Sequence, residues 1–374
     1  MAEEQQYDLR SVCSHFRIDG TYIEAIPYGT GHINDTYASR FRTDTGTVRY
    51  IHQRINHDIF RNVAMLMDNI TRVTKHVRAK VIERGGDPLR ESLTLVPAED
   101  GAAYVRDEDG TFWRTYIFIE GARTYDIIEK PVHVFNASAA FGDFQNMLSD
   151  LPGKPLHETI PDFHNTKKRF GTFVSTLEKD PENRAGQAGP EIDFVLQREK
   201  DASLLIDLIG RGEVPLRVTH NDTKFNNVMI DDATDEGICV IDLDTVMPGL
   251  VMYDFGDSVR IGASTALEDE QDLSNVHMDI DLFEQLTSGY LSTARKFLTP
   301  AEIANLAFSA KLLTFECGMR FLTDFIDGDN YFKVHRPGHN LDRCRTQFKM
   351  VKEMEEQMQK MESIVEQHAQ EEGE

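Results

Sequence analysis

Four oxygen-bearing side chains are concentrated in the middle of the chain, within a segment patterned like a β-hairpin. Asp222 lies just before a first apolar run and Asn227 lies at its start. Asp242 and Asp244 lie at the end of a second run, which follows a turn-rich stretch at 231–237. Period-2 alternation on the second strand predicts that both of its carboxylates face away from the core. A hairpin that gathers carboxylate and amide oxygens offers the ligands that a hard cation such as Mg²⁺ prefers.

The spacing within this segment is typical of phosphoryl transfer. Asp222 follows His220-Asn221 and precedes Asn227 by five residues, and Asp242 comes on a later strand, as in H-R-D-x-x-x-x-N loops with a following metal-binding Asp. Acidic residues also close turns, which is the simpler explanation for those at 231–235. Asp254, in the run Tyr253-Asp254-Phe255-Gly256, is interpreted as a buried acceptor that braces the catalytic loop, with helix capping as the alternative.

Composition excludes several classes of partner. Lys+Arg 40 against Asp+Glu 63 gives a net charge of −23 over 374 residues. Such a balance argues against nucleic acid and against anionic membrane surfaces as partners. No apolar run approaches the ~20 residues of a membrane span, and the N-terminus lacks a signal-peptide pattern. The four cysteines are scattered, as in reduced cytosolic proteins. We therefore expect a cytoplasmic protein.

The N-terminal region has the pattern of a phosphate-binding sheet. Strand patterns over 22–27, 36–42 and 47–55 are interrupted after the first by Gly29-Thr30-Gly31. A glycine-rich turn between two strands would place backbone N–H groups over phosphates. The Lys expected on the third strand is absent. Either Arg54 supplies the charge, with different geometry, or Gln53 occupies that position.

The remaining pattern predicts a hinge and a helical second half. A strand over 112–119 runs into Glu120-Gly121, where backbone groups of Ile119 and Glu120 would bind an adenine edge. Shorter strands are expected at 93–96 and 103–106. Helical periodicity covers 7–16, 63–83, 132–148, 168–177, 193–209, 278–297, 300–326 and 341–367. The last of these carries one apolar seam, from Phe348 to Val365, which predicts packing on the parent lobe or, less often, a dimer contact.

Six segments together resemble a known family, the aminoglycoside-phosphotransferase-like (protein-kinase-like) small-molecule kinases, and within it the branch that phosphorylates N-acetylhexosamines. They are YGTGHINDTY (28–37), IFIEGARTYD (117–126), RVTHNDTKFNN (217–227), VIDLDTVMPG (240–249), YDFGD (253–257) and ECGMRFLTDFIDGDNYFKVHR (316–336). The loop and hairpin motifs specify only the broad class, and the longer stretches 240–257 and 316–336 indicate the hexosamine branch. Ile261, where that branch suggests an aromatic, and the missing strand Lys depart from the pattern.

The resemblance implies an α+β fold of two lobes. A small N-lobe with an antiparallel sheet (1–120) would bind ATP, and a larger, mainly helical C-lobe (121–345) would hold the catalytic and sugar-binding residues. A C-terminal helix with an acidic tail (346–374) would follow the C-lobe. The protein would be a monomer or a weak dimer.

The resemblance also implies specific roles. ATP with Mg²⁺ would phosphorylate the anomeric 1-hydroxyl of GlcNAc or GalNAc, with Asp222 as base and Asn227 and Asp242 as metal ligands. The residues that would contact the sugar are His32, Arg320 and Tyr331.

Other interpretations of the same residues remain open. Arg320 and Asp324, four residues apart on a helix, could simply pair with each other, and Tyr331 could be a core residue. The substrate could instead be another hydroxyl compound, such as an aminoglycoside, choline or methylthioribose. The absent Lys also leaves a non-catalytic pseudokinase as an alternative.

Overall fold

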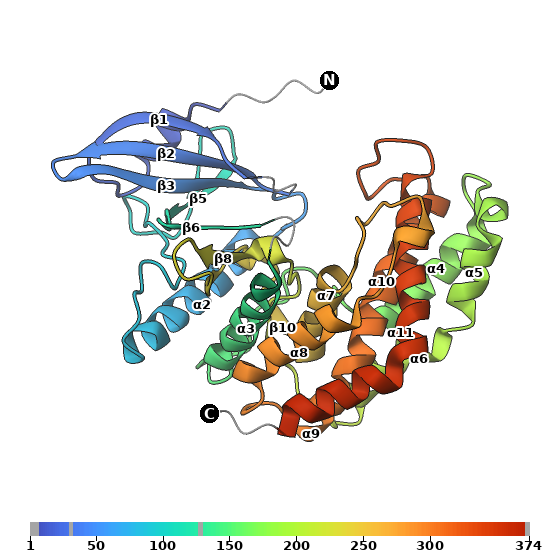
Figure 1. Ribbon diagram of the computed structural model, residues 1–374. Helices are drawn as coiled ribbons and strands as arrows, with labels where there is room; N and C mark the ends of the chain where they lie inside the picture. The colour runs from blue at the N-terminus through green and yellow to red at the C-terminus, as the bar shows by residue number, and fades with distance from the viewer. Residues whose placement is uncertain (1–6, 30–32, 126–129, 371–374) are drawn as a thin grey trace.

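The computed structural model describes residues 7–29, 33–125 and 130–370. Figure 1 shows a small lobe built on strands and a larger lobe built on helices, which confirms the predicted α+β, two-lobed, kinase-like architecture. No helix in these described ranges is long and apolar enough to cross a membrane.

The small lobe is an antiparallel sheet between two helices. The sheet order is β1-β2-β3-β5-β4. Helix α1 (Leu9–Ser14) packs on its outer face around Trp113, and helix α2 (Val63–Glu83) packs on its inner face. Alternation along the strands therefore decides which side chains face the second lobe. The strands are β1 (Thr21–Pro27), β2 (Asp35–Thr43), β3 (Gly46–Ile55), β4 (Val105–Arg106) and β5 (Phe112–Ile117).

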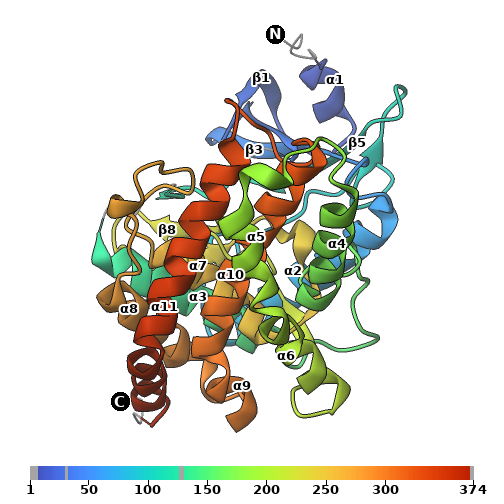
Figure 2. The same cartoon turned by 90° about the vertical axis from the view of Figure 1, so that its right-hand side faces the viewer.

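The large lobe surrounds one apolar core formed mainly by α7, α8, α10 and α11. Figure 2 shows α10 and α11 lying side by side, with α4, α5 and α6 next to them. The helices are α3 (Pro131–Leu148), α4 (Thr166–Lys179), α5 (Gly189–Leu196), α6 (Glu199–Gly210), α7 (Val251–Gly262), α8 (Ile280–Ala294), α9 (Pro300–Ala304), α10 (Leu306–Asp327) and α11 (His339–Gln370). The apolar seam of α11 is buried in this core, so it packs on the parent lobe as expected.

The hairpin predicted in the middle of the chain is present, and it lies where the two lobes meet. Strands β8 (Val228–Asp231) and β9 (Gly237–Val240) pair antiparallel, and β6 (Ala122–Arg123) pairs with β8. Short strands β7 (Arg217–Thr219) and β10 (Met247–Gly249) pair nearby. Apolar side chains of the hairpin pack against α2, β3 and α3 in a single cluster, so the two lobes share a core.

One detail of the predicted hairpin was wrong. Strand β9 ends at Val240, and Asp242 has a left-handed backbone with φ of 58° before the short turn Leu243–Thr245. Alternation therefore stops before the two carboxylates. As a result Asp242 is exposed while Asp244 is buried, and they do not share a face.

Other expected elements also differ in extent. The helix expected over 193–209 is two helices, α5 and α6, and the one over 300–326 is α9 followed by α10. Propensity alone did not indicate these breaks, because no Gly or Pro marks them. The strand expected at 93–96 is reduced to the isolated bridge between Leu95 and Tyr116.

Candidate active site

The loop that carries Asp222 is fixed by a buried carboxylate. The Asp254 carboxylate, in the first turn of α7, accepts N–H bonds from the backbones of His220 (2.8 Å) and Asn221 (2.6 Å). It also accepts one from Gln145 Nε2 at 2.6 Å, and Thr245 Oγ1 donates to the carbonyl of His220. Asp254 thus braces the loop, as predicted, and Asn221 can keep its unusual φ of 66°.

Asp222 and Asn227 meet at the end of this loop. Asn227 Nδ2 donates to the Asp222 carbonyl at 2.8 Å and lies 3.4 Å from Asp222 Oδ2. The Asn227 carbonyl accepts from Ile241 N at 2.9 Å, which places Asp242 next to the pair. Lys224 Nζ lies 3.0 Å from Asp222 Oδ1, so a cation accompanies the expected base. The structure therefore brings together Asp222, Asn227 and Asp242.

The surroundings of Asp242 favour its neutral form. Desolvation by the surrounding protein, and then the carboxylates of Asp244 and Asp222, raise the pKa of Asp242 to about 6. Its side chain nevertheless reaches solvent, so this cost is partly screened. Such a group is stabilised by a bound cation.

The donor set fits Mg²⁺ only in combination with other oxygens. In the described part of the chain no group of three or more His, Cys, Asp and Glu side chains is placed to hold a metal ion. The site instead offers a carboxylate, Asp242, next to an amide, Asn227. Mg²⁺ is commonly bound by one or two protein carboxylates, water and substrate phosphates, so these residues fit it as a partner of a nucleotide.

Asp244 plays a different part from Asp242. Its Oδ1 forms an ion pair with Nη1 of Arg114 on β5, and its Oδ2 accepts from Asn34 Nδ2 at 2.6 Å. The Asp244 and Arg114 side chains are 4% and 1% exposed. With both carboxylate oxygens engaged inside the protein, Asp244 is not available as a metal ligand.

The inner face of the small-lobe sheet carries Gln53 rather than Arg54. Gln53 Oε1 accepts from Arg114 Nε at 3.0 Å and Nη2 at 2.8 Å, on the side that faces the hairpin. Arg54 lies on the opposite face, where it pairs with Asp35 and its guanidinium sits 5.9 Å from the Tyr7 ring. Of the two residues proposed for the place of the missing Lys, Gln53 faces the hairpin, and Arg54, predicted to bind nucleotide, lies on the other face of the sheet.

The glycine-containing turn is described only in part. Gly29 has a φ of 79°, a left-handed conformation that favours glycine, and no atom lies within 4 Å of where its Cβ would be. Asn34, which ends the turn, reaches Asp244. The predictions for Thr30, Gly31 and His32 lie outside the described residues.

Two arginines of the small lobe hold the hinge residues Glu120 and Gly121 in place. Arg90 donates to the carbonyls of Glu120 (3.1 Å) and Gly121 (3.2 Å), and the Glu120 carboxylate pairs with Arg49, whose guanidinium lies 3.6 Å from the centre of the Phe118 ring. Ile119 is buried. The carbonyl and carboxylate of Glu120 are thus engaged within the protein, and the adenine contacts of Ile119 and Glu120 stay predictions.

On the far side of Asp222, a buried His–Glu pair connects the loop to α10. His164 bonds through Nε2 to the Asn221 carbonyl (3.0 Å) and through Nδ1 to Glu316 (2.9 Å). Arg169 Nε lies 3.6 Å from the same carboxylate. Glu316 is the first residue of the stretch 316–336, which carries Arg320 and Tyr331, two of the residues expected to contact the sugar.

Arg320 lies one turn beyond Glu316 on α10. Asp324 does not neutralise it, because the Asp324 carboxylate accepts from the backbones of Tyr331 and Phe332 at 2.8 and 2.9 Å. No carboxylate of a described residue forms an ion pair with Arg320, whose guanidinium lies 5.8 and 5.4 Å from the centres of the Tyr331 and Phe332 rings. Desolvation, and then the charge of Arg320, lower the pKa of Arg169, so the two guanidinium groups are close. Tyr331 is 72% exposed and is not a core residue.

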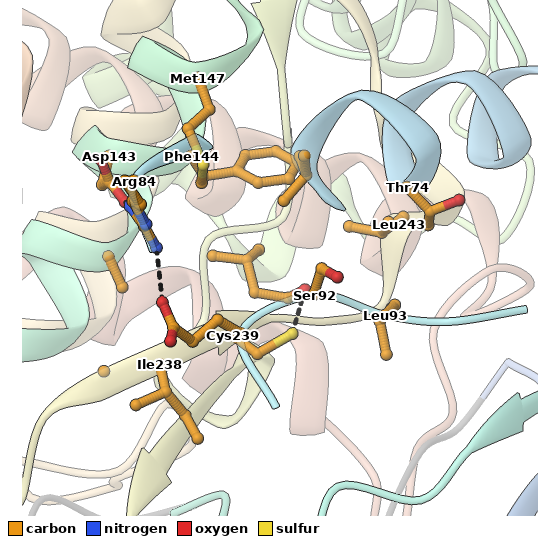
Figure 3. Close-up of a pocket in the computed structure, with 15 residues that line it drawn as sticks. Thr74, Arg84, Ser92, Leu93, Asp143, Phe144, Met147, Ile238, Cys239 and Leu243 are labelled. Carbon is orange, nitrogen blue, oxygen red and sulfur yellow. Dashed lines mark hydrogen bonds and ion pairs between the residues drawn. The ribbon is translucent and has the colours of Figure 1, made fainter. Parts of the chain in front are cut away.

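A separate cavity lies behind the hairpin and not at this site. It is lined by α2, α3 and β9, with the Arg84–Asp143 and Arg84–Glu91 ion pairs at one end and the Cys239 thiol inside (Figure 3). Its volume of about 30 Å³ suits a water molecule or two and no larger ligand. Burial raises the pKa of Cys239 to about 12, so this thiol is unreactive.

The two-lobed fold and the braced Asp222 loop define a kinase-like phosphotransferase, and comparison with known proteins identifies the family. A model of the phosphotransferase enzyme family (APH) matches residues 24–286, and the chain belongs to that family.

Solved structures share the fold at low identity. An aminoglycoside phosphotransferase from Alicyclobacillus acidocaldarius subsp. acidocaldarius DSM 446 is 12% identical, with a TM-score of 0.56, over 98% of this chain and 99% of that one. Choline kinase from Cryptosporidium parvum Iowa II is 12% identical, with a TM-score of 0.56, over 97% and 98%. A spectinomycin phosphotransferase in complex with ADP and spectinomycin is 11% identical, with a TM-score of 0.52, over 96% and 97%.

Sequence reasoning missed three residues of this site. Lys224 lies two positions after Asp222, so its proximity could have been read from the motif. Arg114 and Asn34 gave no such signal, because their link to Asp244 spans 130 and 210 residues.

Proposed function

We propose that the protein is an ATP-dependent sugar 1-kinase that phosphorylates the anomeric hydroxyl of N-acetylhexosamines. The observation that carries the phosphoryl-transfer part is the convergence of Asp222, Asn227 and Asp242 at the end of a loop braced by Asp254. Phosphoryl transfer depends mostly on positioning and charge neutralisation, which is what such a rigid set of side chains supplies.

In this proposal Asp222 acts on the acceptor. Its carboxylate accepts the proton of the 1-hydroxyl as the sugar oxygen bonds to the γ-phosphorus, and the bond from that phosphorus to the β–γ bridging oxygen breaks to release ADP. Asn227 holds Asp222 from one side and Lys224, 3.0 Å away, offsets its charge from the other. Asp242 and Asn227 would hold Mg²⁺, which neutralises phosphate charge when bound.

Asp242 can be tested apart from the base. Asp242→Asn should raise the Mg²⁺ concentration needed for half-maximal turnover and weaken nucleotide binding, because a neutral amide is a poorer ligand for a hard cation. An unchanged Mg²⁺ dependence in this variant would count against the ligand assignment.

The acceptor side favours a neutral sugar over a cationic acceptor. Arg320 has no carboxylate partner among the described residues, and Arg169 lies close to it. Choline and aminoglycosides carry positive charge, which the Arg320 guanidinium repels, whereas the charge of Arg169 is offset by Glu316. A hydroxyl- and amide-bearing sugar instead offers oxygens that accept from Arg and a ring face that can lie against Tyr331.

The test is ADP release with wild-type protein across GlcNAc, GalNAc, glucose, kanamycin and choline. We expect release with the two N-acetylhexosamines and little with the two cations. Turnover of kanamycin or choline alone would replace the sugar assignment with a cationic one. Absence of release with every acceptor, despite nucleotide binding, would favour the pseudokinase alternative.

A further inference from the structure

Two residues of the small lobe bind one buried carboxylate, that of Asp244, just after the catalytic hairpin. Arg114, on β5, forms an ion pair with Asp244 Oδ1, and Asn34, after the glycine-containing turn, donates to Oδ2 at 2.6 Å. Both donors belong to the small lobe, while Asp244 lies two residues beyond Asp242. A shift of either lobe would have to break this arrangement.

Each donor is itself held in place. Gln53 is the direct cross-strand partner of Arg114, and its Oε1 accepts from both Nε and Nη2, which directs Nη1 at Asp244. The Asn34 amide is oriented by the bond from Asn56 N to its Oδ1, at 2.9 Å. Contacts within the small lobe therefore orient both donors toward Asp244.

Helix α2 adds a second connection in the same place. Asn69, fully buried in the middle of α2, donates to the carbonyls of Val246 (3.1 Å) and His157 (2.8 Å). In protein kinases, a Lys on the third strand and a Glu on this helix must pair for activity. Here the third strand offers Gln53 and the helix offers Asn69, so that pair is absent from these positions.

We propose that Arg114, Asp244 and Asn34 form an interlobe clamp that positions Asp242 relative to the small-lobe sheet and replaces the missing Lys–Glu pair. Arg114 is then a positioning residue and not a phosphate ligand. Its donors are engaged by Gln53 and Asp244, and moving it to a phosphate would leave Asp244 buried and unpaired, which is costly. The role in turnover rests on the proposed function.

The experiment is a double-variant cycle with Arg114→Met, Asp244→Asn and the pair together, in the full chain. Arg114→Met alone leaves a buried charge without its partner, and its melting temperature should fall by roughly 5 °C or more. The double variant removes both charges and should recover most of that loss. Arg40→Met is the control, because Arg40 forms an exposed pair with Glu24 in the same sheet, and it should behave like wild type.

The decisive readouts separate positioning from simple stabilisation. In the double variant we expect kcat to stay at least tenfold below wild type and affinity for Mg²⁺·ADP, measured by calorimetry, to fall at least fivefold, although stability recovers. If turnover and Mg²⁺·ADP affinity both recover with stability, Arg114 and Asp244 are only structural and the clamp proposal is overturned.

A milder variant guards against misfolding. Asn34→Ala removes one hydrogen bond to Asp244, and we expect a several-fold higher KM for ATP with the KM for the acceptor unchanged. Unchanged values for both substrates would contradict the clamp. If wild-type protein transfers phosphate to no acceptor, the proposed function fails, and the Mg²⁺·ADP affinities alone then decide whether the clamp positions the nucleotide side.

Discussion

The two sides of Asp222 are organised in different ways. On the side expected to hold the nucleotide, two buried carboxylates have protein partners: Asp254 braces the loop and Asp244 is held by Arg114 and Asn34. On the side expected to hold the acceptor, Arg320 has no carboxylate partner among the described residues and lies close to Arg169, and Tyr331 is largely exposed. Protein contacts thus preorganise the residues expected to carry out phosphoryl transfer. The residues expected to select the acceptor have fewer such contacts, and we expect the bound acceptor to supply them.

The largest effect should come from the base. Asp222→Asn removes the proton acceptor, and a general base contributes ~10²–10⁴-fold in rate, so turnover should become barely measurable. Nucleotide binding, followed by calorimetry, should stay close to wild type. Asp232→Asn is a matched control, since Asp232 forms an exposed pair with Arg123. Retention of more than about a tenth of turnover by Asp222→Asn would mean that Asp222 is not the base.

The brace should come next. Asp254→Ala leaves the N–H groups of His220 and Asn221 buried without their acceptor, at a cost of about 1–3 kcal/mol each. We expect a lower melting temperature together with a loss of kcat, since the loop no longer fixes Asp222. Asp254→Asn keeps an oxygen acceptor and should be milder on both measures. Equal kcat for wild type and Asp254→Ala would show that the loop needs no brace.

The acceptor side should respond more weakly and selectively. Arg320→Met should raise the KM for the sugar about tenfold, equivalent to about 1.4 kcal/mol, and leave the KM for ATP unchanged. Arg198→Met provides the control, because Arg198 also lies over an aromatic ring, that of Phe194, but is paired with Glu355. A rise in the KM for ATP instead would place Arg320 on the nucleotide side and break the contrast between the two sides.

The smallest effect is a pH-dependent change in stability. The folded-state pKa of Asp242, about 6, lies above its ordinary value of 3.8, so folding favours the protonated form. The stabilisation that protonated Asp242 gives to the folded state is complete below pH ~4 and is lost as pH rises through 6. Without nucleotide or metal, Asp242→Asn should therefore be more stable than wild type at pH 8, by about 1 kcal/mol after allowance for exposure. Thermal denaturation between pH 4 and pH 8 would show no such divergence if Asp242 were not strained.

The sequence predicted the parts of the site that are close in the chain. Asp222 and Asn227 lie five residues apart in one loop, and their spacing carries the geometry, while Asp254 follows the hairpin, in the first turn of α7. The exposure of Asp242 and the burial of Asp244 could not be predicted, because a single left-handed residue ends the alternation. Gln53 and Arg54 were equally plausible until strand register decided which faces inward. Arg114 gave no local signal at all, since its role depends on a contact across lobes.

The most direct test of the account is the identity of the product. Wild-type protein, ATP, Mg²⁺ and GlcNAc should be followed by phosphorus and proton NMR. We predict a sugar phosphate whose anomeric proton is coupled to phosphorus, and no product from the methyl glycoside, in which the 1-hydroxyl is blocked. A phosphate ester at another hydroxyl, or transfer to the methyl glycoside, would contradict the assignment of Asp222 to the 1-hydroxyl.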